Sequence, residues 1–192
     1  MQADQPRAGV DPNPGSSDIA RCRGVTCLRN SNATSYVAAV AAVAAVAAVA
    51  AVAAVAEVAV KRKTGEIRVE RVCVAHDGGR IVNPDGAANQ FDGGVIQTVS
   101  RTLMEQVRWD RTKVQSQDWL SYPILRHDQV PRVEVDLIDR PGEPSWGAGE
   151  PTACTMPTAI GNSVFDAPGA RLRAVPLAPA QVPAALARPV AA

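Results

Sequence analysis

Hydrophobic and polar positions divide the chain into four parts. Residues 1–35 are rich in polar and turn-forming residues and carry almost no large apolar side chains over positions 1–20. Such a segment cannot bury enough surface to offset the entropy lost on ordering, so we expect it to be disordered or degenerate. An alanine–valine repeat occupies 36–57, an alternating apolar and polar pattern occupies 58–177, and a proline- and alanine-rich tail occupies 178–192.

The repeat places valine at every third position from Val37 to Val58, with alanine between the valines until Glu57. Three residues advance an α-helix by about 300°, and the period of two of a half-buried strand is also absent, so neither regular pattern is satisfied. Alanine has the highest helix propensity, so the composition favours a helix. Although the uncharged run 37–56 is long enough to span a membrane, alanine is weakly hydrophobic and no aromatic belt flanks the run. We therefore expect a helix that does not cross a membrane.

Alternating residues on both sides of the turn Thr64-Gly65-Glu66 predict a β-hairpin between 58–61 and 67–74. After the turn Asn83-Pro84-Asp85-Gly86, Asp85 is the expected cap of a helix that ends near Gln106. Further along the chain the pattern predicts a second hairpin (107–109 with 113–115), a strand (132–136), a helix opened by Pro157 (158–167) and a short helix after Pro179. Strands and helices therefore mix in an α+β arrangement.

Charge and cysteine content narrow the function classes. A formal net charge of +1 gives no electrostatic case for nucleic acid or for an anionic membrane surface. Cys22, Cys27, Cys73 and Cys154 are scattered, and Cys22 and Cys27 lack a second pair at metal-ligand spacing. They are expected to be free thiols in a reducing compartment. No apolar signal-peptide segment is evident at the N-terminus, so the expected location is the cytoplasm, with the periplasm as the alternative.

Two stretches could carry chemistry. The first is Trp146-Gly147-Ala148-Gly149-Glu150-Pro151, where glycines and a proline surround a single carboxylate. The stretch is either an ordinary surface turn or a loop that presents Glu150 to a buried ligand. The second is the Gly93-Gly94 pair inside the predicted helix, which costs stability unless another group approaches closely. Close helix packing is one explanation, and a cofactor lying against Gln90 and this glycine surface is the other.

Between Tyr36 and Leu177 four motifs follow one another: Val-Ala-His-Asp-Gly-Gly-Arg-Ile-Val-Asn-Pro-Asp-Gly (74–86), Asn-Gln-Phe-Asp-Gly-Gly-Val-Ile-Gln (89–97), Asp-Trp-Leu-Ser-Tyr-Pro-Ile-Leu (118–125), and Ile-Asp-Arg-Pro (138–141) leading into Gly-Ala-Gly-Glu-Pro (147–151). In this order they resemble the C-terminal end of the molybdopterin-binding large subunit of the xanthine dehydrogenase family. The most similar branch is that of isoquinoline 1-oxidoreductase and nicotinate dehydrogenase. The resemblance implies part of a molybdopterin-binding domain, a mixed sheet with packed helices.

The resemblance also implies roles for individual residues. Glu150 takes the position of the catalytic base, and Gln90, Gly93, Gly94 and Gly149 take positions that contact the molybdenum–molybdopterin cofactor. In this family the base removes a proton from a molybdenum-bound hydroxyl, and the substrate, an N-heteroaromatic compound or an aldehyde, gains oxygen derived from water. An apolar pocket would raise the proton affinity of such a carboxylate. None of these residues is expected to ligate a metal ion directly.

Two hypotheses follow from the differences between this chain and the family. Much of the family's cofactor pocket comes from segments that precede Tyr36, so the remainder of the subunit is an expected partner. A small [2Fe–2S] subunit would carry the electrons away. His76 and His127 lack a nucleophile or metal-ligand spacing and are expected to be structural or exposed. The chain is then either a piece of a molybdenum hydroxylase, unsuited to work in isolation, or a truncated or decayed polypeptide without enzymatic activity.

Overall fold

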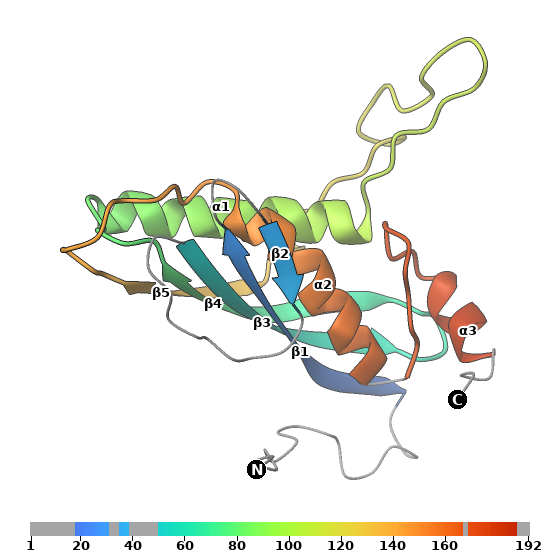
Figure 1. Cartoon of the computed structure of the whole chain (residues 1–192). Helices are drawn as coiled ribbons and strands as arrows, with labels where there is room; N and C mark the ends of the chain where they lie inside the picture. Colours follow the sequence, from blue (N-terminus) through green and yellow to red (C-terminus); the bar gives the residue numbers. More distant parts are fainter. Residues whose placement is uncertain (1–17, 31–34, 39–49, 167–168, 188–192) are drawn as a thin grey trace.

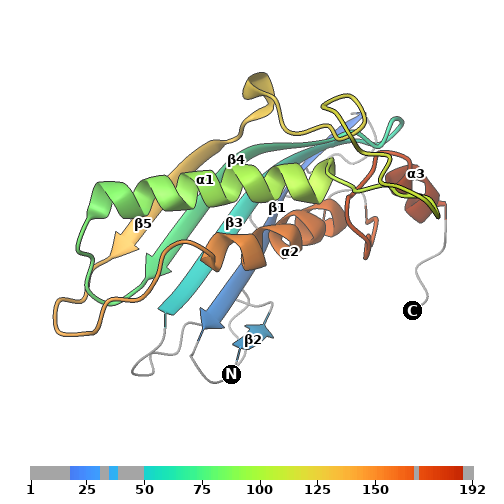
Figure 2. The ribbon, with the colours of Figure 1, turned by 90° about the horizontal axis from the view of Figure 1, so that it is seen from above.

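In the computed structural model, the described residues are 18–30, 35–38, 50–166 and 169–187. They form a sheet of five strands with two long helices, α1 and α2, on one of its faces (Figures 1 and 2). The elements in chain order are β1 (Ile19–Asn30), β2 (Ser35–Ala38), β3 (Ala50–Lys61), β4 (Ile67–Asp77), α1 (Pro84–Leu103), the 3₁₀ turn η1 (His127–Gln129), β5 (Arg132–Ile138), α2 (Pro151–Asp166) and α3 (Gln181–Leu186).

The sheet is mixed. Its spatial order is β2-β1-β3-β4-β5, in which β1 pairs antiparallel with β2 and β3, β3 pairs antiparallel with β4, and β5 runs parallel to β4. A parallel pair needs a long crossover, and α1 lies in the crossover between β4 and β5. The hairpin predicted on both sides of Thr64-Gly65-Glu66, the strand at 132–136 and the mixed sheet with packed helices are thus confirmed.

The helix predicted for residues 37–56 of the alanine–valine repeat is wrong wherever the structure describes them. Residues 50–56 belong to β3, a central strand, Val37 and Ala38 lie in β2, and 39–49 lie outside the described residues. On β3 a period of three sends valines alternately to the two faces, so Val52 and Val58 are buried whereas Val55 is only half-buried. Alanine is small and apolar enough for either face. Pairing with a neighbour on each side outweighs its local helix propensity.

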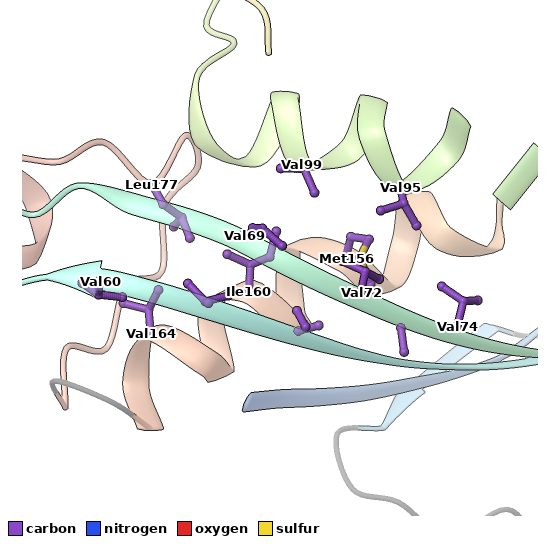
Figure 3. Close-up of a cluster of buried hydrophobic side chains, with 14 of the residues drawn as sticks. Val60, Val69, Val72, Val74, Val95, Val99, Met156, Ile160, Val164 and Leu177 are labelled. Atoms are coloured by element: carbon purple, nitrogen blue, oxygen red, sulfur yellow. The ribbon is translucent and has the colours of Figure 1, made fainter. Parts of the chain in front are cut away.

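The core lies between the helices and the sheet (Figure 3). Alternate residues of β3 point into it, and an irregularity opposite Glu57 and Val58 shifts the register of β4, so that Val69 and Val72 are both buried. From the helix side the core receives Val95, Val99, Met156, Ile160 and Val164. Burial of each such side chain contributes roughly 1.5–3 kcal/mol, and here it holds α1 and α2 to the sheet.

Both long helices begin earlier than predicted. Asn83, not Asp85, caps α1, and its side-chain oxygen accepts a hydrogen bond from the Gly86 N–H at 2.9 Å. The helix expected to open at Pro157 begins at Pro151 instead and contains Pro157 in its interior. Pro151 suits a first helical position because the missing N–H would have no helical acceptor there. The catalytic candidate Glu150 therefore directly precedes a helix.

The expected segment boundaries also change. β1 occupies 19–30, inside the part expected to be disordered or degenerate, so the sheet begins well before residue 58. In the tail beyond residue 177 the predicted short helix is present as α3, and its Val182 is fully buried. Within the part of the chain that the structure describes, each helix is too short or too polar to cross a bilayer.

Candidate functional site

Glu150 lies at the N-terminal end of α2, where its carbonyl oxygen accepts a hydrogen bond from the Ala153 N–H at 2.9 Å. Its side chain is exposed on the border of a surface hollow of about 510 Å³ between α1 and α2. The hollow is also lined by Thr98, Arg101, Thr102, Ala153, Cys154, Pro157 and Val175. The carboxylate is thus available to a molecule bound there, but these residues do not enclose it in the apolar pocket expected for a base.

The loop that leads to Glu150 is fastened to the end of β4. The Trp146 N–H donates to the Gly78 carbonyl at 2.8 Å, and the Arg140 N–H donates to the Gly79 carbonyl at 2.9 Å. Gly79 has a φ of +74°, and a Cβ there would lie 2.0 Å from the Pro144 carbonyl oxygen, so only glycine fits. The Gly-Gly pair of the first motif therefore fixes the loop that ends at Glu150.

Gln90 and Gly149 are brought together by this arrangement. The Gln90 side-chain oxygen lies 3.8 Å from the point where a Cβ on Gly149 would be. The amide of Gln90 is exposed on α1 and offers both a donor and an acceptor next to the residue that precedes Glu150. Of the five predicted site residues, Gln90 and Gly149 are thus neighbours in space, and Glu150 follows Gly149 in the chain.

The two helical glycines differ in their surroundings. A Cβ on Gly94 would lie 2.2 Å from the Thr152 hydroxyl oxygen, so this glycine allows α1 and α2 to pack closely. At Gly93 nothing lies within 4 Å of the corresponding point. Helix packing therefore explains Gly94, whereas Gly93 leaves room for another molecule to approach α1.

Buried polar atoms without partners identify residues that the sequence did not indicate. Among the described residues, the Thr152 hydroxyl and the Trp146 indole nitrogen are buried and make no hydrogen bond within the chain. Both flank the Gly149-Glu150 segment. Buried polar atoms normally have partners, so such unpaired groups mark places where contacts are still to be made. Only their position in the sequence could have indicated them, since both residues lie within four residues of Glu150.

Among the described residues, His, Cys, Asp and Glu side chains form no group that could hold a metal ion. The thiols of Cys73 and Cys154 are free, in agreement with the expectation for these two residues. The side chains of Cys22 and Cys27 lie outside those that are described.

His76 is another buried group without hydrogen-bond partners among the described residues. Its ring is 1% exposed, packs on Phe91 with 4.6 Å between ring centroids, and faces the Cα of Gly78 closely enough that a Cβ there would lie 2.2 Å from Nε2. Both ring nitrogens lack partners within the described structure. Burial lowers the pKa of the imidazole, and the nearby Asp77 opposes this effect only in part. His127, by contrast, is exposed.

We expect His76 to make folding pH-dependent. Because its pKa is lower in the folded than in the unfolded chain, the unfolded chain binds the proton more readily, and stability falls as pH drops below the ordinary value of about 6.5. His76→Leu should flatten the curve of unfolding free energy against pH between about pH 5 and 7. Urea titrations at several pH values measure the unfolding free energy, and His127→Leu is the control. An unchanged slope in His76→Leu would show that other groups cause the dependence.

More than half of the chain matches a known family. Residues 29–131 match the family model described as "Molybdopterin cofactor-binding domain". A nicotinate dehydrogenase subunit of Pseudomonas putida is 44% identical over 128 residues, which are 67% of this chain and 11% of the relative. The β chain of isoquinoline 1-oxidoreductase of Brevundimonas diminuta is 34% identical over 62% of this chain and 15% of the relative. The chain thus spans only a small part of these curated relatives.

Solved structures agree in fold. Quinoline 2-oxidoreductase of Pseudomonas putida superposes with a TM-score of 0.66 and 24% identity, over 72% of this chain and 19% of that one. The aldehyde oxidoreductase of Desulfovibrio gigas gives a TM-score of 0.65 and 24% identity, over 73% of this chain and 16% of that one. The family match over more than half of the chain, the sequence relatives and the shared fold lead to one conclusion: this chain belongs to the molybdopterin cofactor-binding domain family and corresponds to part of that domain in a xanthine dehydrogenase-family large subunit.

Proposed function

We propose that this chain supplies the catalytic base and part of the cofactor-facing surface of a molybdenum hydroxylase large subunit. The assembled enzyme would oxidise N-heteroaromatic compounds or aldehydes with oxygen taken from water. One observation carries the proposal: the Gln90 amide lies beside the open backbone of Gly149, and the next residue, Glu150, lines a hollow between α1 and α2 at the start of α2. The nicotinate and isoquinoline enzymes among its relatives support the substrate class.

The residues present fit a polar organic cofactor. Thr152 and Trp146 offer buried hydrogen-bonding atoms without partners, Gln90 offers an amide edge, and Gly93 leaves open space beside it. We assign Gln90 and the glycines Gly93 and Gly149 to cofactor binding. Gly94 contributes indirectly, because it lets α2 approach α1. When bound, a molybdenum–molybdopterin cofactor supplies the redox centre that takes electrons from the substrate.

Glu150 performs the proton step of this proposal. Its carboxylate accepts the proton of a water-derived hydroxyl, which makes that oxygen a stronger nucleophile toward an electron-poor carbon. The backbone hydrogen bonds from Trp146 and Arg140 to the Gly78-Gly79 backbone hold the loop that leads to this residue. Since Glu150 is exposed here, we assign the enclosure of the carboxylate to the remainder of the large subunit.

The proposal includes partners and a location. The relatives are named as subunits, which implies partner subunits for this chain. We propose a small [2Fe–2S] subunit as the electron acceptor and a small molecule as the substrate. The free thiols of Cys73 and Cys154 are compatible with the reducing cytoplasm, where we place the enzyme.

The test is cofactor retention in a graft. Residues 50–177 would replace the matching segment of the Pseudomonas putida nicotinate dehydrogenase subunit, and Gln90→Ala should lower the molybdenum content of the purified graft because the hydrogen bonds of the cofactor edge lose their partner. Asn89→Ala, which removes an exposed amide one residue earlier, should leave the content unchanged. Metal analysis provides the measurement. A graft that folds but lacks molybdenum before any substitution would favour a decayed, non-enzymatic polypeptide.

A further inference from the structure

Residues 105–126, here called the arm, project away from the helices and sheet (Figure 1). A single antiparallel bridge between Trp109 and Val114, where the sequence predicted a hairpin, is its only strand pairing within the described residues. Trp109 is 72% exposed, Trp119 75% and Leu120 90%. Two of the three tryptophans of the chain thus lie almost uncovered on a projecting segment. Exposure of large apolar side chains such as tryptophan and leucine to water is unfavourable in free energy. A group of them on one projecting segment therefore indicates a contact surface.

The arm holds its shape through its own hydrogen bonds. The Asp110 carboxylate accepts hydrogen bonds from the Thr112 and Lys113 N–H groups at 2.7 and 3.0 Å, and it also accepts one from the Thr112 hydroxyl. Together these bonds, of which the hydroxyl bond has the largest effect, lower the pKa of Asp110 to about 2. The Asp118 carboxylate accepts from the Leu120 and Ser121 N–H groups at 3.1 and 2.8 Å. The exposed apolar side chains are therefore presented on a preformed framework, which reduces the entropy lost when a partner binds.

The base of the arm is held by two further hydrogen bonds. Within the arm, the Tyr122 hydroxyl donates to Glu105 at 2.8 Å, and the Leu125 N–H attaches the arm to α1 by donating to the hydroxyl of Ser100 at 2.9 Å. Next to them, Trp119, Pro123, Ile124 and Arg126 line a hollow of about 240 Å³. The hollow has room for an apolar side chain from a partner, with the Arg126 guanidinium at its border for a carboxylate or carbonyl oxygen.

We propose that the arm docks onto the portion of a molybdenum hydroxylase large subunit that this chain does not contain, with Trp119 and Leu120 as the anchors. The inference rests on the proposed function. Its occupant follows from length: 128 residues of this chain match only 11% of the nicotinate dehydrogenase subunit, so most of such a protein lies outside it. Aromatic anchor residues contribute much of the binding free energy of protein interfaces, and the preformed arm presents exposed tryptophans to that large remainder.

The experiment measures binding rather than activity. The full chain carries an affinity tag and is co-expressed with the Pseudomonas putida nicotinate dehydrogenase subunit, from which the matching segment has been deleted. We expect the two to purify together, and the double variant Trp119→Ser/Leu120→Ser to bind at least about tenfold more weakly. Val82→Ser is the matched control, because it removes a 78% exposed apolar side chain that lies off the arm. Its affinity should equal that of the unmodified chain.

Each result of the binding experiment either supports or contradicts docking through the arm. Both changes are at exposed positions, so circular dichroism and the melting temperature of the double variant should match those of the unmodified chain. Equal binding of the double variant, or no binding of the unmodified chain, overturns the assignment of the arm. If light scattering shows a dimer of the chain alone that the double variant dissociates, a second copy is the occupant and the inference is wrong. Molybdenum retention by the graft is measured separately, so failure of the proposed function is distinguishable.

Discussion

Replacement of Glu150 by glutamine in the graft should reduce turnover by ~10²–10⁴-fold, about 3 to 5 kcal/mol of activation free energy, while molybdenum remains bound. Glutamine keeps the size and hydrogen-bonding capacity of the side chain but cannot accept the proton. Because Glu150 is exposed and its backbone contact to Ala153 does not involve the side chain, the fold should not change. The measurement is the oxidation rate of nicotinate or an aldehyde together with metal content.

Glu143→Gln is the matched control for this prediction. Glu143 lies in the same loop, and its carboxylate lies 3.9 Å from Arg140, too far for a strong ion pair. Its replacement should leave the rate within about twofold of the unmodified graft. Near-normal turnover in Glu150→Gln would mean that another residue is the base, and the proposed function would lose its main support.

Gly24→Ala should cause a large loss of stability. Gly24 lies on β1 where α2 crosses the strand, and a Cβ there would lie 1.8 Å from the Ala159 carbonyl oxygen and 2.5 Å from the Ser163 nitrogen. Both are backbone atoms of a helix, so β1 and α2 must separate to make room. The overpacking should lower the unfolding free energy by about 3 kcal/mol, as measured by urea unfolding followed by circular dichroism.

The same substitution at Gly93 should have the opposite sign. Nothing lies within 4 Å of the added Cβ, and alanine is favoured over glycine in a helix by roughly 0.8–1 kcal/mol. Gly93→Ala should therefore raise the unfolding free energy of the chain in the absence of cofactor. If both variants unfolded at the same urea concentration, the close approach of α2 to β1 would not be the feature that makes Gly24 necessary.

The motifs predicted much of the candidate site because they combine special backbone needs with particular side chains. Gln90 comes from one motif and Gly149 and Glu150 from another, and the structure places Gln90 beside Gly149. Thr152 and Trp146 could not be selected in the same way. Their hydroxyl and indole groups become notable only when burial removes water and leaves them without partners, and burial depends on where α1 and α2 pack.

The alanine–valine repeat shows the limit of local reasoning. Alanine favours a helix by its intrinsic propensity. In the folded chain, however, β1 and β4 provide hydrogen-bonding partners on both sides, and residues 50–58 form part of a central strand. The sequence itself determined the β3–β4 hairpin and β5, because alternation and turn residues act over a few positions, and the resemblance of its motifs to a known family implied the mixed sheet. Only the tertiary structure decided the state of the repeat, the packing role of Gly94 and the burial of His76. These depend on contacts between segments far apart in the chain, and such contacts outweigh propensities of less than 1 kcal/mol per residue.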